Sequence, residues 1–446
     1  MTDRQTRPFA LTAAQERLAA EVRVLARDVL APLAAAGRPG RVNRPLVRAL
    51  GEHGLLARLL PSDPGAPDGR WRHLPAGPSS APGVPEEQPR QPLLAGPSSA
   101  PGAPDRQLRR HLPAGPSSAM DLCLLREALA RESTEAETAL ALQGLGAHPI
   151  AVAGRPAVRR RFLPAVAAGQ SVAAFALSEP AAGSDAAGLA LRADPDGDGF
   201  RLSGVKAWIS NAPEADVYTV FARTTQGARS RGITAFAVPG DAPGLGGEPV
   251  ELLAPHAIGR LELDGVRVGG DQVLGRVDQG FELAMRTLDR FRPSVGAFAV
   301  GMAQAALDLA VAHAAGRQAF GRPLGEFQAV AHALAEAATR TQAARLLVYE
   351  AASRYDADPA SPGVTKAAAM AKLYATETAQ AVVDQAVQVL GARALERGHL
   401  LEHLYREVRA PRIYEGTSEI QRTVIARELF RATVEPDGGG LPPSGP

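Results

Sequence analysis

The sequence predicts an α+β protein in which two helical regions flank one β domain. Apolar residues recur at helical spacing before about residue 170 and again, in long Ala- and Leu-rich segments, after about residue 280. Between these regions the spacing changes to short apolar runs separated by turn residues, which is typical of strands. We therefore expect an all-α N-terminal domain over residues 1–170, an antiparallel β-barrel or sandwich over residues 171–275, and a C-terminal four-helix bundle over residues 276–432.

The N-terminal region carries several short helical patterns. Thr12 precedes the first pattern, whose apolar residues are spaced by three or four positions. These residues are Leu18, Val22, Leu25, Val29 and Leu33. Further helices are expected over residues 44–60, 121–133, 134–146 and 156–168.

Residues 61–119 interrupt this region with a segment rich in Pro, Gly, Ser and Ala. The hexapeptide Ala-Gly-Pro-Ser-Ser-Ala occurs three times, starting at Ala76, Ala95 and Ala114. A stacking repeat needs an apolar face, and these copies carry few apolar residues. We expect a disordered or polyproline-like insertion, produced by duplication within a loop, with a protein-binding spacer as the alternative. The Pro- and Gly-rich tail over residues 433–446 is also expected to be disordered.

The middle region contains a series of short predicted strands. They cover residues 172–177, 189–193, 200–209, 217–222, 233–238 and 260–268. Asp196-Gly197-Asp198-Gly199 is typical of a hairpin turn between two of them. No helical pattern separates the strands, so most neighbours should pair antiparallel. The run Gly244–Gly247 precedes no helix and is therefore not a Rossmann phosphate loop.

The C-terminal region returns to long amphipathic helices. They are expected over residues 280–315, 324–356, 362–391 and 418–430, with a shorter helix over residues 398–409.

Composition argues against several classes of partner. The 446 residues carry a formal charge of +2, and the basic residues are dispersed among acidic ones, so we expect no nucleic-acid and no membrane partner. Cys123 is the single cysteine and the histidines lack metal-ligand spacing, so we expect no disulfide and no metal site. We find no secretory signal pattern and no apolar stretch long enough to span a bilayer, which predicts a cytoplasmic protein.

The most informative stretch surrounds Glu415. Pro411 should end one helix, and Ser418 with Gln421 is typical of a capping box that starts the next. Glu415 and Gly416 would then occupy a short loop between two helices. A carboxylate placed there can act as a general base if apolar surroundings raise its pKa. A solvated carboxylate at an ordinary helix start is the alternative.

Four motifs in order resemble the acyl-CoA dehydrogenase family. They are Ala176-Leu177-Ser178-Glu179-Pro180-Ala181-Ala182-Gly183-Ser184-Asp185, Lys206-Ala207-Trp208-Ile209-Ser210-Asn211, Arg317-Gln318-Ala319-Phe320-Gly321 followed by Phe327-Gln328, and Ile413-Tyr414-Glu415-Gly416-Thr417-Ser418-Glu419-Ile420-Gln421-Arg422. The likeness covers about residues 121–430, with a weaker match over residues 9–61. In the family the base is the glutamate of the last motif, here Glu415. In a minority of relatives the base is instead a glutamate at the position of Phe291. Because this chain has phenylalanine there, that arrangement is ruled out.

The resemblance implies bound FAD, held partly by a neighbouring subunit, and the homotetramer that the family generally forms. The implied cofactor residues are Phe175, Leu177, Ser178, Trp208, Ile209, Ser210, Arg317, Phe320, Gln328, Gln388, Leu390, Gly391, Thr417 and Glu419. The implied substrate residues are Ser184, Asp289, Arg292, Tyr414 and Gly416. From the residues alone, a core tryptophan at 208, a polar turn at 183–185 and a surface arginine at 292 are the alternatives. Ala392 stands where the family usually has glycine.

The implied reaction is α,β-dehydrogenation of an acyl-CoA thioester in fatty acid metabolism. Glu415 would remove the α-proton, and the β-hydrogen would pass as hydride to flavin N5, with an electron-transfer flavoprotein as the implied electron acceptor. An acyl-CoA oxidase, or a non-catalytic flavin-binding member like the family's DNA-repair-associated branch, is the alternative. The motifs leave open the acyl length, branching, ring content and whether the carrier is CoA or an acyl-carrier protein.

Overall fold

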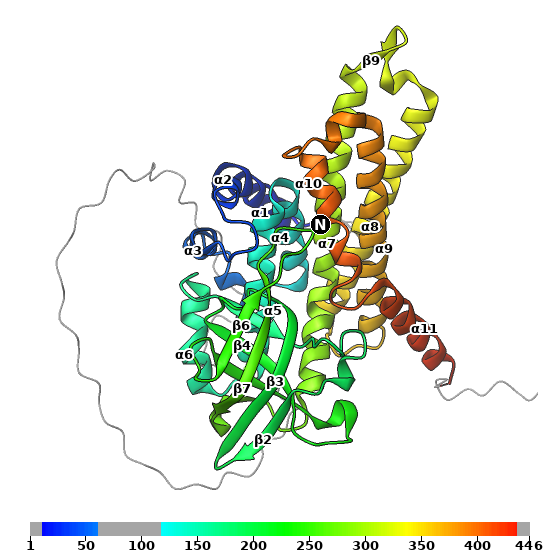
Figure 1. Ribbon diagram of the computed structural model, residues 1–446. Helices are drawn as coiled ribbons and strands as arrows, with labels where there is room; N and C mark the ends of the chain where they lie inside the picture. The colour runs from blue at the N-terminus through cyan, green and yellow to red at the C-terminus, as the bar shows by residue number, and fades with distance from the viewer. Residues whose placement is uncertain (1–10, 61–116, 435–446) are drawn as a thin grey trace, which may run out of the picture.

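The computed structural model describes residues 11–60 and 117–434, in which a group of helices and a long helical bundle enclose one side of a β domain (Figure 1). The predicted α+β class, with its helical N-terminal, β middle and helical C-terminal parts, is confirmed. Residues 61–116 of the predicted insertion and residues 435–446 of the predicted tail lie outside the described residues. Residue 119 already belongs to a helix, and the last helix extends to Val434.

The N-terminal helices follow the predicted order with shifted ends. They are α1 (Ala13–Leu25), the π-helical turn η1 (Ala26–Leu30), α2 (Ala31–Ala35), α3 (Arg44–Glu52), the 3₁₀ turn η2 (Ala57–Leu59), α4 (Ala119–Glu132), α5 (Thr134–Ala153) and α6 (Pro156–Ala167). Thr12 caps α1 in a capping box with Gln15. The helix expected over residues 44–60 stops at Glu52, and α5 continues seven residues beyond its expected end at Gly146. Pro149 lies inside α5, so this proline did not end the helix.

The middle domain is a single open sheet with a sandwich-like shape. Its strands are β1 (Ala173–Ala176), β2 (Arg192–Asp196), β3 (Gly199–Ser210), β4 (Val217–Arg223), β5 (Ile233–Pro239), β6 (Leu245–Pro249), β7 (Ile258–Val268) and β8 (Val273–Leu274). The order is β6-β7-β3-β2-β4-β5-β8, with β1 pairing parallel to β4, so the sheet keeps open edges and the barrel alternative is wrong. Most other pairs are antiparallel, as expected. The prediction missed β6, which begins within the glycine run, and the two-residue β8.

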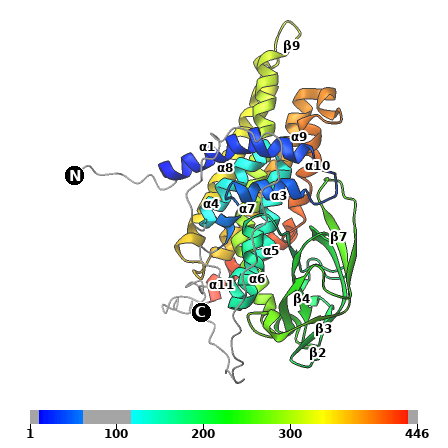
Figure 2. The same ribbon diagram turned by 90° about the vertical axis from the view of Figure 1, so that its left-hand side faces the viewer.

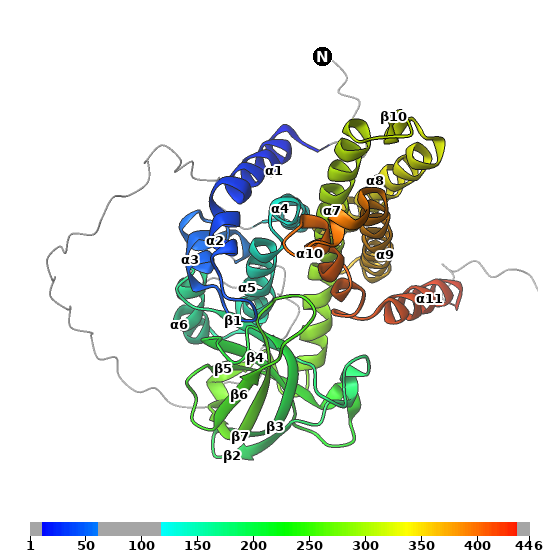
Figure 3. The same ribbon diagram turned by 45° about the horizontal axis from the view of Figure 1, so that its top comes forward.

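The C-terminal domain is built on three long helices. They are α7 (Gly280–Gly316), α8 (Gln328–Ala357) and α9 (Val364–Leu390), followed by the 3₁₀ turn η9 (Gly391–Leu395), α10 (Leu400–Glu407), the 3₁₀ turn η10 (Ala410–Arg412) and α11 (Ser418–Val434). Side chains of α4 share their apolar core, while α11 points away from the bundle in two views (Figures 1 and 3). A small hairpin of β9 (Gln318–Ala319) and β10 (Arg322–Pro323) joins α7 to α8. Figure 2 shows this hairpin and β2 at opposite ends of the molecule.

The helix α7 is long and apolar enough to cross a bilayer by length and composition, contrary to the expectation from sequence. Its most apolar window is 72% buried inside the protein, as befits the central helix of a bundle. The same helix runs from the β domain to the β9–β10 hairpin and so links the two ends of the molecule (Figure 1).

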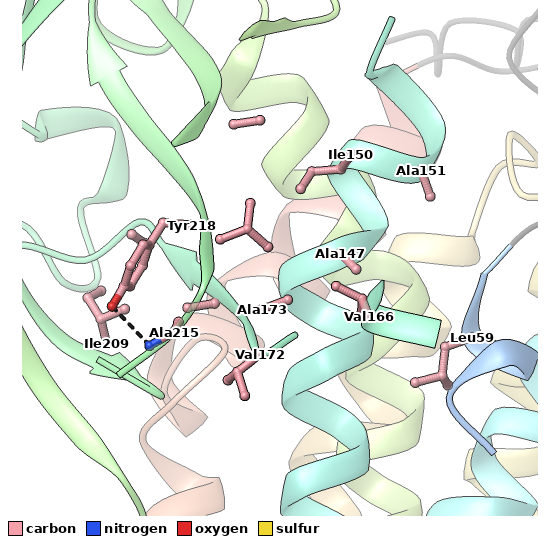
Figure 4. Packing of buried hydrophobic residues seen from close by; sticks show 14 of the residues in the cluster. Leu59, Ala147, Ile150, Ala151, Val166, Val172, Ala173, Ile209, Ala215 and Tyr218 are labelled. Carbon is pink, nitrogen blue, oxygen red and sulfur yellow. Dashed lines mark hydrogen bonds between the residues drawn. The ribbon is translucent and has the colours of Figure 1, made fainter. Parts of the chain in front are cut away.

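The contact between α5 and β1 joins the helical and β parts of the main core. Ala147 and Ile150 of α5 lie beside Ala173 of β1 (Figure 4), and all three are fully buried. Thr219 of β4 donates a 2.8 Å hydrogen bond to the carbonyl of Gly146. A Cβ atom on Gly146 would lie 2.6 Å from the backbone nitrogen of Ala174, so only glycine allows this close approach.

We expect Gly146→Ala to lower the melting temperature, because the methyl group would push α5 off the sheet. The overpacking should cost about 1–3 kcal/mol and exceed the gain in helix propensity. Gly246→Ala is the matched control, since a Cβ atom there meets nothing within 4 Å. Thermal unfolding followed by circular dichroism measures both variants. Equal melting temperatures for the two would show that α5 does not depend on this approach.

Candidate active site

Glu415 lies in a loop between η10 and α11 whose backbone is held by three helices. Both Glu415 (φ 52°) and Gly416 (φ 91°) have left-handed backbone conformations. The carbonyl oxygen of Glu415 accepts hydrogen bonds from Arg292 Nε and Gln421 Nε2, each at 3.2 Å. That of Gly416 accepts from Gln421 Nε2 at 2.9 Å and from Lys372 Nζ at 2.7 Å. We call Glu415 and Gly416 the base turn; its donors come from α7, α9 and α11.

The capping box expected from Ser418 and Gln421 is wrong. Thr417 caps α11 instead, because its Oγ1 accepts from the backbone N–H of Ile420 at 3.3 Å. The Ser418 hydroxyl donates to Glu377 on α9 at 2.5 Å. The Gln421 side chain turns back to the carbonyls of the base turn, where two successive left-handed residues direct both oxygens toward it.

The Glu415 carboxyl group has the surroundings of a general base. Its Oε2 atom is buried and has no hydrogen-bond partner among the described residues. Burial raises the pKa of this carboxyl group above its usual value, and the positive charges of Arg126, Arg292 and Lys372 oppose that rise. The backbone N–H of Glu415 also has no acceptor in the described part of the chain. A proton acceptor and a free donor therefore lie on the same residue.

Arg126, one of the cations that act on Glu415, belongs to a buried ion pair. Arg126 of α4 binds Glu137 of α5, and their side chains are 3% and 1% exposed. Arg126 Nη1 also donates to Ser294 on α7 at 2.7 Å. Sequence analysis missed this pair, although a charged residue within the apolar pattern of α4 was a visible signal.

The strands β1 and β3 bring two of the expected cofactor segments together. The carbonyl of Ser178 accepts from the backbone N–H of Ala207 at 3.1 Å, which places residues 175–178 beside residues 208–210. Trp208 has a φ of 56° and its side chain is 53% exposed, unlike a core tryptophan. Its ring is therefore available to a ligand at this edge of the sheet.

A buried lysine fixes this arrangement, and sequence analysis assigned it no role. Lys206 Nζ donates to the carbonyl of Leu177 at 2.9 Å and to Glu179 Oε1 at 2.8 Å. Glu179 also accepts from the backbone N–H groups of Ala190 and Leu191, at 2.6 and 3.0 Å. Burial lowers the pKa of Lys206 to about 8, although Glu179 opposes that change.

The expected substrate residues fall into two groups. Arg292 is buried, not at the surface, and binds both Asp289, at 3.1 Å, and the base turn. Thr365 of α9 donates to the other oxygen of Asp289 at 2.8 Å. Ser184 belongs instead to an exposed loop, in which the neighbouring Asp185 pairs with Arg229. These substrate roles remain predictions.

The other expected cofactor residues lie at the far end of the bundle. Arg317 and Gln328 lie on either side of the β9–β10 hairpin and Phe320 lies in its turn; Figure 1 shows the hairpin at the opposite end from the β domain. The end of α9, with Gln388, Leu390 and Gly391, is at the same end of the bundle. Both Arg317 and Arg393, next to that helix end, lower the pKa of His313, in addition to burial. Phe320 is 95% exposed.

The residues present fit a flavin dinucleotide. A half-exposed tryptophan face suits a flavin ring, and the unpartnered oxygen of Glu415 suits a reacting substrate. An arginine such as Arg317, without an ion pair in the described residues, suits a pyrophosphate. Within one chain Trp208 belongs to β3 of the β domain, whereas Arg317 directly follows α7 beside the β9–β10 hairpin, which Figure 1 shows at the end of the bundle away from the β domain.

Comparisons with known proteins agree on one family. The model of the acyl-CoA dehydrogenase middle domain matches residues 174–266, and that of the C-terminal domain matches residues 278–430. Cyclohexane-1-carbonyl-CoA dehydrogenase of Geobacter metallireducens is 37% identical over 70% of this chain and 81% of its own length. Short-chain specific acyl-CoA dehydrogenase of Bos taurus is 42% identical over 64% of this chain and 69% of its own. The structure of butyryl-CoA dehydrogenase from Megasphaera elsdenii matches with a TM-score of 0.78 and 29% identity, covering 95% of this chain and all of the other.

We expect Glu179→Ala to destabilise the protein more than Lys206→Met. The first change leaves a buried ammonium group and two backbone N–H groups without their acceptor, which should cost about 3–5 kcal/mol. The second leaves the carboxylate bound to the same two N–H groups. Thermal unfolding at one fixed protein concentration ranks the variants. The reverse order would mean that the ammonium group, not the carboxylate, organises this edge.

Proposed function

We propose, on the premise that this chain belongs to the acyl-CoA dehydrogenase family, that it oxidises an acyl-CoA thioester to the trans-2-enoyl-CoA with Glu415 as the base. Family membership makes the protein an oxidoreductase of acyl-CoA metabolism. The observation that carries the proposal for Glu415 is its buried, unpartnered Oε2 atom on a turn fixed by three helices.

The chain supplies the acid–base part of the reaction. Glu415 takes the α-proton of the substrate, and its own backbone N–H donates to the thioester carbonyl as negative charge develops there. Bound FAD would take the β-hydrogen with its electron pair at N5, so that the substrate loses two electrons and the flavin gains them. The positive charges of Arg126, Arg292 and Lys372 favour the ionised form of Glu415 against the effect of burial.

Two copies of the chain would hold each cofactor in this proposal. Phe175, Leu177, Ser178, Trp208, Ile209, Ser210, Thr417 and Glu419 would contact FAD from one copy, and Arg317, Phe320, Gln328, Gln388, Leu390 and Gly391 from the other. The separation of these sets within one chain supports an assembly of at least two copies, and we propose a homotetramer. A cytoplasmic location and an electron-transfer flavoprotein as acceptor belong to the same proposal.

The substrate would be an acyl-CoA whose carrier passes near Ser184, Asp289 and Arg292, with its reacting end at Tyr414 and Gly416. The names of the matched relatives cover short-chain and alicyclic acyl groups.

Anaerobic titration of the flavin-loaded protein with saturated acyl-CoAs tests the proposal. The panel should include butyryl-CoA, longer straight chains and cyclohexane-1-carbonyl-CoA. Loss of the oxidised flavin absorbance with one group of thioesters would support dehydrogenation and narrow the substrate. A flavin that no thioester bleaches, or a protein unable to take up FAD, would contradict it. Rapid reaction of the reduced enzyme with oxygen would favour the oxidase alternative.

We expect Glu415→Gln to retain FAD but to bleach at least 100-fold more slowly, because a general base contributes roughly 10²–10⁴ in rate. Glu336→Gln is the matched control, since Glu336 is an exposed partner of Arg340 on α8. Stopped-flow absorbance after mixing with the best thioester gives both rates. A Glu415→Gln enzyme as fast as the control would exclude Glu415 as the base.

We also expect the rate of flavin reduction to fall on the acid side of a pKa above 4.5, the usual value for glutamate. Burial favours the protonated carboxyl group, and a protonated Glu415 accepts no proton, so the active fraction rises with pH through this shifted pKa. Single-turnover rates measured over the acid range locate the midpoint. A midpoint at or below the usual glutamate value would show that burial does not dominate the ionisation of Glu415.

A further inference from the structure

Lysine is rare in this chain and lies at two places in the site. Of the 49 basic residues only three, Lys206, Lys366 and Lys372, are lysines. Two of these, Lys206 and Lys372, have no exposed surface. A lysine presents a compact charge on a thin stem, whereas the arginine fork needs several acceptors in one plane. In a chain that otherwise uses arginine, these two positions therefore point to a local requirement for an ammonium group.

Lys372 differs from Lys206 in what it binds. Lys206 has the Glu179 carboxylate within hydrogen-bond distance. The hydrogen bond of Lys372 among the described residues goes to the carbonyl of Gly416, at 2.7 Å. A buried ammonium that binds a neutral oxygen gains less than one that binds a carboxylate, so its position needs another explanation.

The base turn supplies that explanation. A glutamate with left-handed backbone conformation is strained, and it persists only where its surroundings fix it. Without Lys372, Gln421 would be the remaining donor to the Gly416 carbonyl in the described part of the chain, and Gln421 belongs to the same loop–helix segment. Lys372 therefore ties the turn to α9, a helix that belongs to the bundle core.

Charged groups from the base turn, α7, α9 and α11 act on Lys372. Glu415 of the base turn, Glu377 of α9 and Glu419 of α11 favour its charged form, while Arg292 of α7 disfavours it. Burial is the largest influence, and it lowers the pKa of Lys372 to about 8. The lysine is thus still charged near neutral pH, where its charge acts on Glu415.

We propose that Lys372 is a positioning residue for the base: its buried ammonium group fixes the base turn through the Gly416 carbonyl and provides the positive charge that faces Glu415 from α9. The proposal rests on the proposed role of Glu415. It goes beyond that role by assigning both the geometry and the ionisation of the base to a side chain that does not touch the substrate.

Lys372→Met removes the charge and the donor with little change in volume. We expect kcat to fall roughly 10- to 100-fold with little change in KM, because the base is misplaced while the substrate contacts remain. The acid limb of the pH–rate profile should move up by about one pH unit, because a positive charge that favours ionised Glu415 is lost. Hydrogen exchange of the peptide over residues 413–421, followed by mass spectrometry, should become faster in the same variant.

Lys366→Met is the matched control, on the first turn of α9 and without a hydrogen bond to the base turn. It should keep the wild-type rate, pH profile and exchange. Lys372→Gln replaces the charge with a neutral donor and carries the test if Lys372→Met does not fold. Flavin content and melting temperature are measured for every variant. They distinguish a loss of activity caused by lost FAD or lower stability from one caused by displacement of Glu415.

An unshifted acid limb in both Lys372 variants would overturn the electrostatic part of the proposal. Unchanged exchange of residues 413–421 in Lys372→Met would overturn its structural part. The exchange measurement needs no substrate, so it remains informative if no thioester bleaches the wild-type flavin, a result that would count against the proposed function alone. A wild-type enzyme that bleaches, together with a Lys372→Met variant indistinguishable from it, would count against the inference alone.

Discussion

The hydrogen bonds to two consecutive carbonyl oxygens of the base turn are the constraint on which the rest of the site depends. Each donor belongs to a different helix, so α7, α9 and α11 can hold Glu415 only while they keep their mutual positions. The apolar core that α4, α7, α8 and α9 share fixes the mutual positions of the bundle helices. The pKa of the Glu415 carboxyl group therefore depends on core packing, because the helices that bury Glu415 also carry the cations that oppose its protonation.

Buried charged groups also fix the backbone at the β1–β3 edge, where two expected cofactor segments meet. Lys206 and Glu179 tie the end of β1 to β3, and the parallel pairing of β1 with β4 places that end inside the domain. The strand β1 pairs with β4 but lies off the main strand order, which the open sheet allows. The α5–β1 contact at Gly146 then connects this edge to the helices beneath it.

The sequence was most informative where a signal is local. Helical spacing predicted α7, α8 and α9 to within a few residues. The last of the four motifs contains the buried carboxyl group of Glu415. The failures concern relations between distant residues. The capping of α11 by Thr417 and the bond from Gln421 to the base turn depend on two left-handed residues that no pattern specified. The Arg126–Glu137 and Lys372–Gly416 contacts join segments that only the folded chain brings together. Strand β6 was missed because its glycines lack strand propensity and it pairs only through β7.

The left-handed backbone at Glu415 restricts how this position can change over evolutionary time. Glycine, asparagine and aspartate are the residues that this conformation accepts most readily, and each has a shorter side chain than glutamate. Residues that match the length of glutamate lack its carboxylate. No single substitution therefore combines an unstrained backbone, the side-chain length of glutamate and a carboxylate. A lineage that lost the base here would find it easier to recruit a carboxylate from another helix than to adjust this one by small steps.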